Sequence, residues 1–286
     1  MTGPSELPDP AGLAEELWEA AADLEDEGSL VAAAELYRQA VTAYESADQE
    51  QTARRLELHL AGLLTSIGDA DSAHSALGRI QDWARRDGDR LLQAAVWVEQ
   101  AELEVDQGLD LVGDQVQPRP ERLDEAAVLI DRAVRELEAH PGEDVPLHVR
   151  SLVLAGEIST LRGRHTDAVA RLDTALACAS AHADQFTDQP ALIDEIVLDL
   201  AEAAVASEQP DRAAQVFHDA RRRALRDRDE EGVWLWTLHL GRHLVALGDR
   251  DAGRQWLTRL RDQLEIAGDQ DYLPEVRDTL AALDHP

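Results

Sequence analysis

Small and apolar residues recur along the chain with the spacing of one helix face. In each case a small residue is followed four positions later by a large apolar residue, and three positions beyond that by a small or apolar one. Spacings of four and three place all three residues on one helical face, with the small residue where two helices approach most closely. Each set therefore predicts one helix. The six sets are Ala33, Tyr37, Ala40; Ala73, Leu77, Ile80; Ala126, Ile130, Ala133; Ala168, Leu172, Ala175; Ala213, Phe217, Ala220; and Gly253, Leu257, Leu260.

A turn signal and a further apolar-periodic segment precede these predicted helices. Gly28, Gly68, Gly163 and Gly248 occupy the turn in four units, and SEQPDR at 207–212 marks another, with Pro at the start of the next helix. The first residues of successive sets lie 40, 53, 42, 45 and 40 positions apart. The chain is therefore predicted to form six helix-turn-helix hairpins of about forty residues each, as in a helical solenoid.

The repeat resembles the tetratricopeptide repeat (TPR) family, in a long-repeat form of about forty residues that is similar to the repeats of kinesin light chains and bacterial regulators. Ala155 and Gly156 match the family's step in the first helix, and Ala213, Phe217 and Ala220 match its step in the second. The units are longer than the usual TPR unit, and the Trp residues lie one position away from the place of Trp in the family's signature. The resemblance implies an all-α, right-handed superhelical solenoid of antiparallel helix hairpins.

Irregular stretches set the expected boundaries. Residues 1–12 are predicted to be a disordered N-terminal tail, and residues 13–286 a single TPR-like repeat domain. Residues 108–120 contain two Gly, two Pro and no helical period, so they predict an insertion loop in the third hairpin, which is either a tolerated surface insertion or a flap that contacts a partner. Residues 271–284 predict one unpaired helix that caps the solenoid.

The charge balance excludes several functions. The chain has 27 cationic and 58 acidic residues, which gives a net charge of −31, and all its cations are Arg. This charge repels nucleic acids and anionic membranes, so neither is an expected partner. Without Lys there is no phosphate-binding loop of the usual kind and no Schiff-base chemistry. A single Cys, no signal peptide and no long apolar run favour a cytoplasmic protein.

Three motifs fit either a chemical role or a packing role. His239 and His243 lie four apart, a spacing that can bind zinc, but no third ligand is apparent, which favours packed or solvated rings. The Arg-rich stretch at 220–231 reads as a charged helix end rather than a nucleic-acid patch. Trp234 and Trp236 cannot both be buried on one side of a helix, so one of them is a candidate interface residue. We therefore predict no enzyme activity, no metal site and no cofactor.

The family resemblance implies that the first helix of each hairpin lines a concave groove. Positions left free by packing then form an acidic trough with isolated Arg residues, although these carboxylates also fit an ordinary solvated face of an acidic chain. With neither Lys nor Asn, the groove cannot hold a peptide in the ways familiar in the family. The predicted groove residues are Trp18, Glu25, Arg55, Leu58, Thr65, Glu99, Asp106, Arg150, Glu157, Glu195, Glu202, Leu235, Leu238 and Arg242.

The predicted function is a non-enzymatic protein-interaction scaffold that binds a peptide segment or helix, of basic character, in this groove. The alternative is a regulatory sensor that binds a small peptide or signalling ligand and transmits a conformational change to a partner. A homo-oligomer is compatible with either function.

Overall fold

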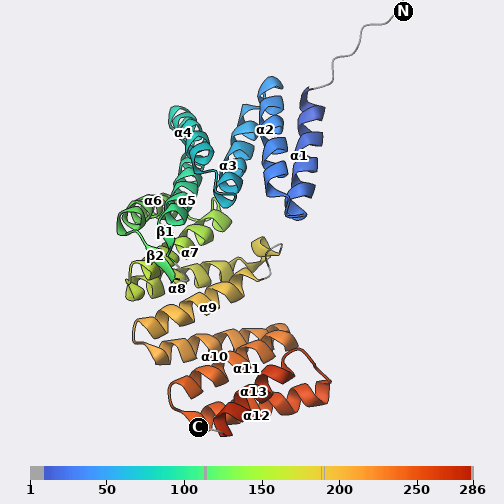
Figure 1. The fold of residues 1–286 in the computed structure, drawn as a ribbon, viewed down its shortest axis with the longest axis vertical. Coiled ribbons are helices and arrows are strands. Elements are labelled where there is room, and N and C mark those ends of the chain that lie inside the picture. The colour runs from blue at the N-terminus through green and yellow to red at the C-terminus, as the bar shows by residue number, and fades with distance from the viewer. Residues whose placement is uncertain (1–9, 113–114, 188, 190, 285–286) are drawn as a thin grey trace, which may run out of the picture. The chain divides into compact units, whose positions relative to one another are not determined.

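The computed structural model describes residues 10–112, 115–187, 189 and 191–284. In this part of the chain, α-helices alternate with short turns, and a two-stranded β-hairpin and one 3-10 turn interrupt the series (Figure 1). The chain divides into two compact units, unit 1 (Met1–Ile158) and unit 2 (Ser159–Pro286). None of the described helices is long and apolar enough to cross a membrane.

Unit 1 contains the first helices of the series, and its apolar core is built largely from Ala and Leu. Helix α7 begins in unit 1 and continues past its last residue. The elements are α1 (Pro10–Asp26), α2 (Leu30–Ser46), α3 (Glu50–Ser66), α4 (Ala70–Asp87), α5 (Arg90–Gln107), β1 (Leu109–Val112), β2 (Gln115–Pro118), α6 (Pro120–Ala139) and α7 (Val145–Leu161).

Unit 2 holds the remaining elements, with one core cluster around α9 and α10 and a second around α12 and α13. The elements are α8 (His165–Ala181), η1 (Ala183–Phe186), α9 (Leu192–Ala206), α10 (Pro210–Asp227), α11 (Glu230–Ala246), α12 (Arg250–Ala267) and α13 (Leu273–Asp284).

Five of the six predicted helix hairpins are confirmed. In unit 1, α1 packs against α2, α3 against α4 and α5 against α6; in unit 2, α9 packs against α10 and α11 against α12. Five of the six small-apolar sets lie on the second helix of one of these hairpins, the sixth lies on α8, and the small residues at the start of all six sets are buried. Small side chains let the two helix backbones approach, as at Gly253, where an added Cβ would lie 2.7 Å from the carbonyl oxygen of Gly241. The fold class is therefore all-α, built from TPR-like hairpins.

Left-handed backbone conformations follow the first helix in several hairpins, although not in α5–α6, where Gly108 has φ of −86°. Gly68 and Gly248 have φ of +78° and +89°, and Glu208 occupies the same place in the α9–α10 turn with φ of +60°. The following helix begins with a capping side chain in some units: Asp69 accepts a hydrogen bond from the backbone N–H of Ser72 at 3.3 Å. The turns are thus specified locally by residues that tolerate positive φ and by caps.

Substitution of the turn glycines tests this assignment. Gly68→Val and Gly248→Val are expected to lower the free energy of unfolding by about 1 kcal/mol or more, because β-branched residues disfavour positive φ. No heavy atom lies within 4 Å of a Cβ added at either glycine, so backbone strain alone causes the loss. Glu208→Gly relieves the same strain and should raise stability or leave it unchanged. Urea denaturation measures all three, and unchanged midpoints in both Val variants would contradict the turn assignment.

Three boundaries differ from the sequence-based predictions. Residues 10–12, assigned to the tail, are helical because α1 already begins at Pro10, while residues 1–9 lie outside the described part. The stretch at 108–120 contains an antiparallel pair of strands in which Leu109 pairs with Pro118, and residues 113–114 lie outside the described part. The final helix begins at Leu273 rather than at 271.

Candidate binding surfaces

The predicted groove residues do not all face solvent. In unit 1, Trp18, Arg55, Asp106, Arg150 and Glu157 are exposed, as are Glu195, Glu202 and Arg242 in unit 2. Glu25, Leu58 and Leu235 are half-buried. Thr65, Glu99 and Leu238 are buried, so the prediction that these three are free for a partner is wrong.

Leu238 is buried because residues of α12 and α13 pack around it. Its side chain is only 2% exposed and belongs to an apolar cluster with Leu257 and with Val276 of α13. The guanidinium of Arg242, one turn further along α11, forms an ion pair with Glu275 of α13. Helix α13 therefore covers the part of α11 that carries Leu238 and Arg242.

Glu99 is buried in an internal ion-pair network. Its side chain lies on α5, and its Oε1 accepts a hydrogen bond from Arg150 Nη1 of α7 at 2.6 Å. Arg150 also binds both carboxylate oxygens of Glu102, at 3.0 and 2.6 Å. Burial raises the pKa of Glu99, against the opposing effect of Arg150. Two predicted groove residues, Glu99 and Arg150, are thus brought together, but they bind each other.

The neighbouring carboxylate Glu25 is also engaged within unit 1. Its Oε2 accepts hydrogen bonds from the hydroxyl of Tyr37 and from Nε2 of His59, each at 2.8 Å. Burial alone would raise the pKa of Glu25, but these hydrogen bonds outweigh it and lower the pKa. The first helices of unit 1 therefore present a surface whose predicted carboxylates are partly neutralised internally.

In unit 2 the first helices α9 and α11 form an open cleft of about 460 Å³. Its wall is largely apolar, and the exposed side chains of Glu202 and Arg242 lie at the polar part of the lining. Both residues belong to the predicted groove set, and they occupy the same repeat position, one residue after the buried small residue of their helix. The lining consists of Leu198, Ala201, Glu202, Val205, Ala206, Phe217, His239, Arg242, His243 and Ala246.

The two histidines of this cleft pack against aromatic rings. The His239 ring stacks on Phe217, with centroids 5.6 Å apart, and lies 5.8 Å from Trp236. The His243 ring meets Phe217 edge-on, and its Nε2 lies 2.9 Å from the carbonyl oxygen of Pro210. Among the described residues, no group of three or more His, Cys, Asp or Glu side chains could hold a metal ion. The histidine pair is thus accounted for by packing and hydrogen bonding.

The environment of His239 predicts a pH dependence of stability. Burial lowers the pKa of His239, and Arg242 lowers it further. When the pH falls below about 6.5, the unfolded chain binds a proton at this residue that the folded protein resists. Acidification should therefore reduce the free energy of unfolding less in His239→Phe, which keeps the ring contacts, than in the wild type. Equal losses in urea denaturation at neutral and mildly acidic pH would contradict this.

Three carboxylates line one face of α9. Glu195, Asp199 and Glu202 are spaced four and three residues apart, so they neighbour each other along the helix. Burial raises the pKa of Asp199, and the charges of Glu202 and Glu195 raise it further. Because these like charges repel, this face of α9 is suited to a cationic ligand.

The Arg-rich end of α10 and the Trp pair of α11 make contacts within unit 2. Arg221 donates a hydrogen bond to the Thr237 hydroxyl at 2.9 Å and lies over the Trp256 ring, 4.9 Å from its centroid. Trp236 is 1% exposed and lies in the core. Trp234 is half-buried against Tyr272, with centroids 6.5 Å apart. These residues therefore connect α10, α11 and their neighbours.

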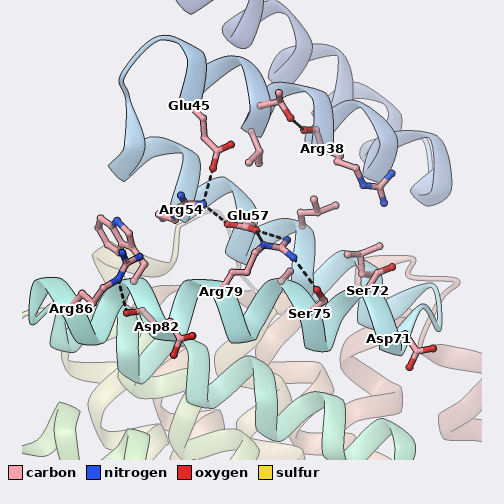
Figure 2. A pocket seen from close by; sticks show the side chains of 16 residues that line it. Arg38, Glu45, Arg54, Glu57, Asp71, Ser72, Ser75, Arg79, Asp82 and Arg86 are labelled. Atoms are coloured by element: carbon pink, nitrogen blue, oxygen red, sulfur yellow. Dashed lines mark hydrogen bonds and ion pairs between the residues drawn. The ribbon is translucent and has the colours of Figure 1, made fainter.

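A second cleft, which the sequence did not predict, lies in unit 1 between the second helices α2 and α4 and over α3 (Figure 2). Its volume is about 790 Å³. Glu57 of α3 is 3% exposed and lies at the centre of the charged groups that Figure 2 shows. Its Oε1 accepts from Arg79 Nε and Nη2 at 2.9 and 2.6 Å, and its Oε2 from Arg54 Nη1 at 2.8 Å. Arg54 also pairs with Glu45 at 2.8 Å.

Comparisons with known proteins define the fold. No protein-family model and no curated protein matches the sequence. The apo form of RapI is similar in structure, with TM-score 0.64 and 13% identity over 95% of this chain and 71% of that one. A Rap protein complexed with Competence and Sporulation Factor has TM-score 0.57 and 11% identity, over 94% of this chain and 74% of that one.

A third similar structure is a signal transduction ATPase with numerous domains from Pyrococcus horikoshii, which has a tetratricopeptide repeat sensor. Its TM-score is 0.62 at 15% identity, over 95% of this chain and 38% of the longer protein. At sequence identities of 11–15%, the similarity to these structures shows a shared fold only. The chain therefore has the fold of tetratricopeptide-type helical repeat proteins, as the repeat pattern predicts.

Proposed function

We propose that this protein is a non-enzymatic interaction scaffold that binds a basic peptide segment or helix of another protein. The observation that carries the proposal is the cleft between α9 and α11, which combines an apolar wall with exposed charges of Glu202 and Arg242. Apolar clefts with a few fixed polar groups suit a peptide, because the apolar wall supplies affinity and the polar groups set its register.

The charge of α9 supports a basic rather than an acidic ligand. Glu195 and Glu202 are exposed on the same face, and the pKa of Asp199 between them is raised in part by their repulsion. A Lys or Arg side chain placed among these groups relieves that repulsion. The net charge of −31 acts in the same direction, since it attracts cationic partners and accelerates their association.

The similar folds are consistent with this proposal. A Rap protein of the same fold has been solved in complex with Competence and Sporulation Factor. Within unit 1, the exposed groove residues Trp18, Arg55 and Asp106 are proposed to provide further contacts on their own surface. The net charge of −31 argues against nucleic acids and anionic membranes as partners, and we propose a cytoplasmic location.

A regulatory sensor is the second candidate. A protein of the same fold carries a tetratricopeptide repeat sensor, and Glu99 Oε2 is buried without a hydrogen-bond partner among the described residues. Such an unsatisfied group favours a rearrangement that pairs it, as a ligand-driven change would provide. A sensor would change its helix packing on binding a ligand, whereas a scaffold would not.

Calorimetric titration with designed peptides tests the main proposal. The acetylated and amidated peptide Leu-Arg-Leu-Arg-Leu should show saturable binding to the full chain, and its counterpart Leu-Glu-Leu-Glu-Leu should not. Binding of the basic peptide should weaken as salt rises, because screening reduces the attraction. Equal binding of both peptides, or of neither, would contradict a basic-peptide scaffold.

A further inference from the structure

Glu57 occupies a repeat position that other first helices fill with uncharged residues. Five first helices can be aligned by the residue of positive φ in their turns, at Gly28, Gly68, Gly163, Glu208 and Gly248. Eleven residues before these turn residues lie Leu17, Glu57, Leu152, Val197 and Thr237.

The fold itself does not need a charge at this position. Val197 is fully buried at the equivalent place in α9, and Leu152 is almost so. The cleft between α8 and α10, which Val197 lines, is formed largely by positions equivalent to those of the α2–α4 cleft, but it is smaller, at about 300 Å³. A buried carboxylate costs free energy unless it is paired, so Glu57 and its arginines make the α2–α4 cleft a specialised site.

The arrangement in this cleft already shows how a guanidinium binds Glu57. Arg79 reaches from α4 and places both Nε and Nη2 on Oε1, while its Nη1 donates to the Ser75 hydroxyl at 2.9 Å (Figure 2). The Arg79 side chain is 59% exposed although its partner carboxylate is buried. An exposed side chain on a buried acceptor can leave for water at modest cost, provided that another cation takes its place.

The lining of the cleft carries four carboxylates and four arginines, and two of these carboxylates have no ion-pair partner among the described residues. Arg86 also lines the cleft, and its Nε donates to the backbone carbonyl oxygen of Asp82 rather than to the carboxylate. Asp71 and Asp82 lie on α4 on either side of Arg79, and neither has an ion-pair partner in the part of the chain that the structure describes. They are separated by eleven residues, roughly 16 Å along the helix. A basic segment that lies along α4 can therefore place one cation on Glu57 and others near the two aspartates.

We propose that the α2–α4 cleft is a second interaction site, which receives an arginine side chain from a basic segment of a partner protein. In the free protein, Arg79 occupies the place of that side chain on Glu57, and the partner's guanidinium displaces it. Arginine is preferred to lysine because the planar guanidinium can present two nitrogens to one carboxylate, whereas an ammonium is a point charge. This site lies on other helices than the α9–α11 cleft and is independent of the function proposed for it.

Removal of the resident arginine gives the sharpest test. The acetylated, amidated tripeptide Ala-Arg-Ala is titrated calorimetrically into the full chain carrying Glu195→Arg and Glu202→Arg, which disables the α9–α11 cleft. Adding Arg79→Ala should tighten binding about tenfold or more, because the site no longer has to be vacated. The peptide Ala-Lys-Ala should gain less.

A matched control separates this effect from general charge. Arg38 lines the same cleft but pairs with the exposed Glu35, so Arg38→Ala removes the same charge without opening Glu57. It should leave the affinity almost unchanged. Equal gains from Arg38→Ala and Arg79→Ala, or no saturable binding by Arg79→Ala, would overturn the proposal.

A second substitution covers the case in which Arg79→Ala fails to fold, which circular dichroism would reveal. Glu57→Val introduces the residue found at position 197 and should fold. With Arg79 retained, it should weaken tripeptide binding about tenfold relative to its parent, the loss expected when a charge-assisted pair is removed. Glu45→Gln, which removes a charge that contacts Arg54 but not Arg79, is the control. Equal losses in the two variants would overturn the proposal.

Discussion

Gly253→Ala is expected to destabilise the protein by about 2 kcal/mol, although Ala is intrinsically the better helix former by about 1 kcal/mol. The reason is the contact between α11 and α12. A Cβ at Gly253 would lie 2.5 Å from Cγ2 of Val245 and 2.7 Å from the carbonyl oxygen of Gly241. Part of this contact is backbone, which cannot move aside as a flexible side chain would. The two helices must therefore separate or bend.

Gly78→Ala is the matched control. Gly78 also lies within a second helix, α4, but a Cβ added there meets no heavy atom within 4 Å. Helix propensity then acts alone and should stabilise the protein by up to about 1 kcal/mol. The two substitutions are thus predicted to have opposite signs in urea denaturation. Stabilisation by both would show that the small residues of the repeat pattern do not mark the close approach of helices.

Charge reversal on α9 is expected to have the largest effect on binding. Glu195→Arg combined with Glu202→Arg should weaken the Leu-Arg-Leu-Arg-Leu peptide about tenfold or more, mainly through its association rate, because attraction becomes repulsion. Asp211→Arg with Asp227→Arg changes the net charge of the chain equally. Both aspartates are exposed on the second helix α10, so this control should lose little.

Salt separates a local effect from a global one. The loss caused by the α9 variant should shrink as the ionic strength rises, since screening shortens the range of exposed charges to about 8 Å at physiological salt. Stopped-flow measurement of the association rate at two salt concentrations gives this directly. Equal losses from the α9 and α10 variants would point to nonspecific charge attraction.

The fold was predictable because its determinants are local. The set Ala33, Tyr37 and Ala40 defines a helix face within eight residues, and Gly68 or Gly248 defines a turn by itself. The β-hairpin at 109–118 is hard to predict because Gly and Pro residues in this stretch are also typical of an irregular loop. The alternating polar and apolar residues of LDLV and QVQ carried the signal for strands.

The candidate sites were less predictable because they depend on contacts between distant residues. Leu238 follows the groove register, but its burial results from the packing of α12 and α13 around it. Glu99 was expected to face a partner, yet it binds Arg150, 51 positions away. Glu202 and Arg242 follow from the groove register, whereas Glu57 lies outside that register but differs from the uncharged residues that aligned first helices carry at its position. The alignment of the first helices thus identifies Glu57 as an exception, but it does not identify the arginines that bind it.

The most direct test of the binding face is hydrogen exchange of the full chain with and without saturating Leu-Arg-Leu-Arg-Leu peptide, read by mass spectrometry. The account predicts that the peptide slows exchange in the first helices α9 and α11 of unit 2, around Glu202 and Arg242, and leaves the second helices α10 and α12 unchanged. Protection confined to α10 and α12, or no protection in unit 2, would contradict the assignment of the α9–α11 cleft as the peptide-binding site.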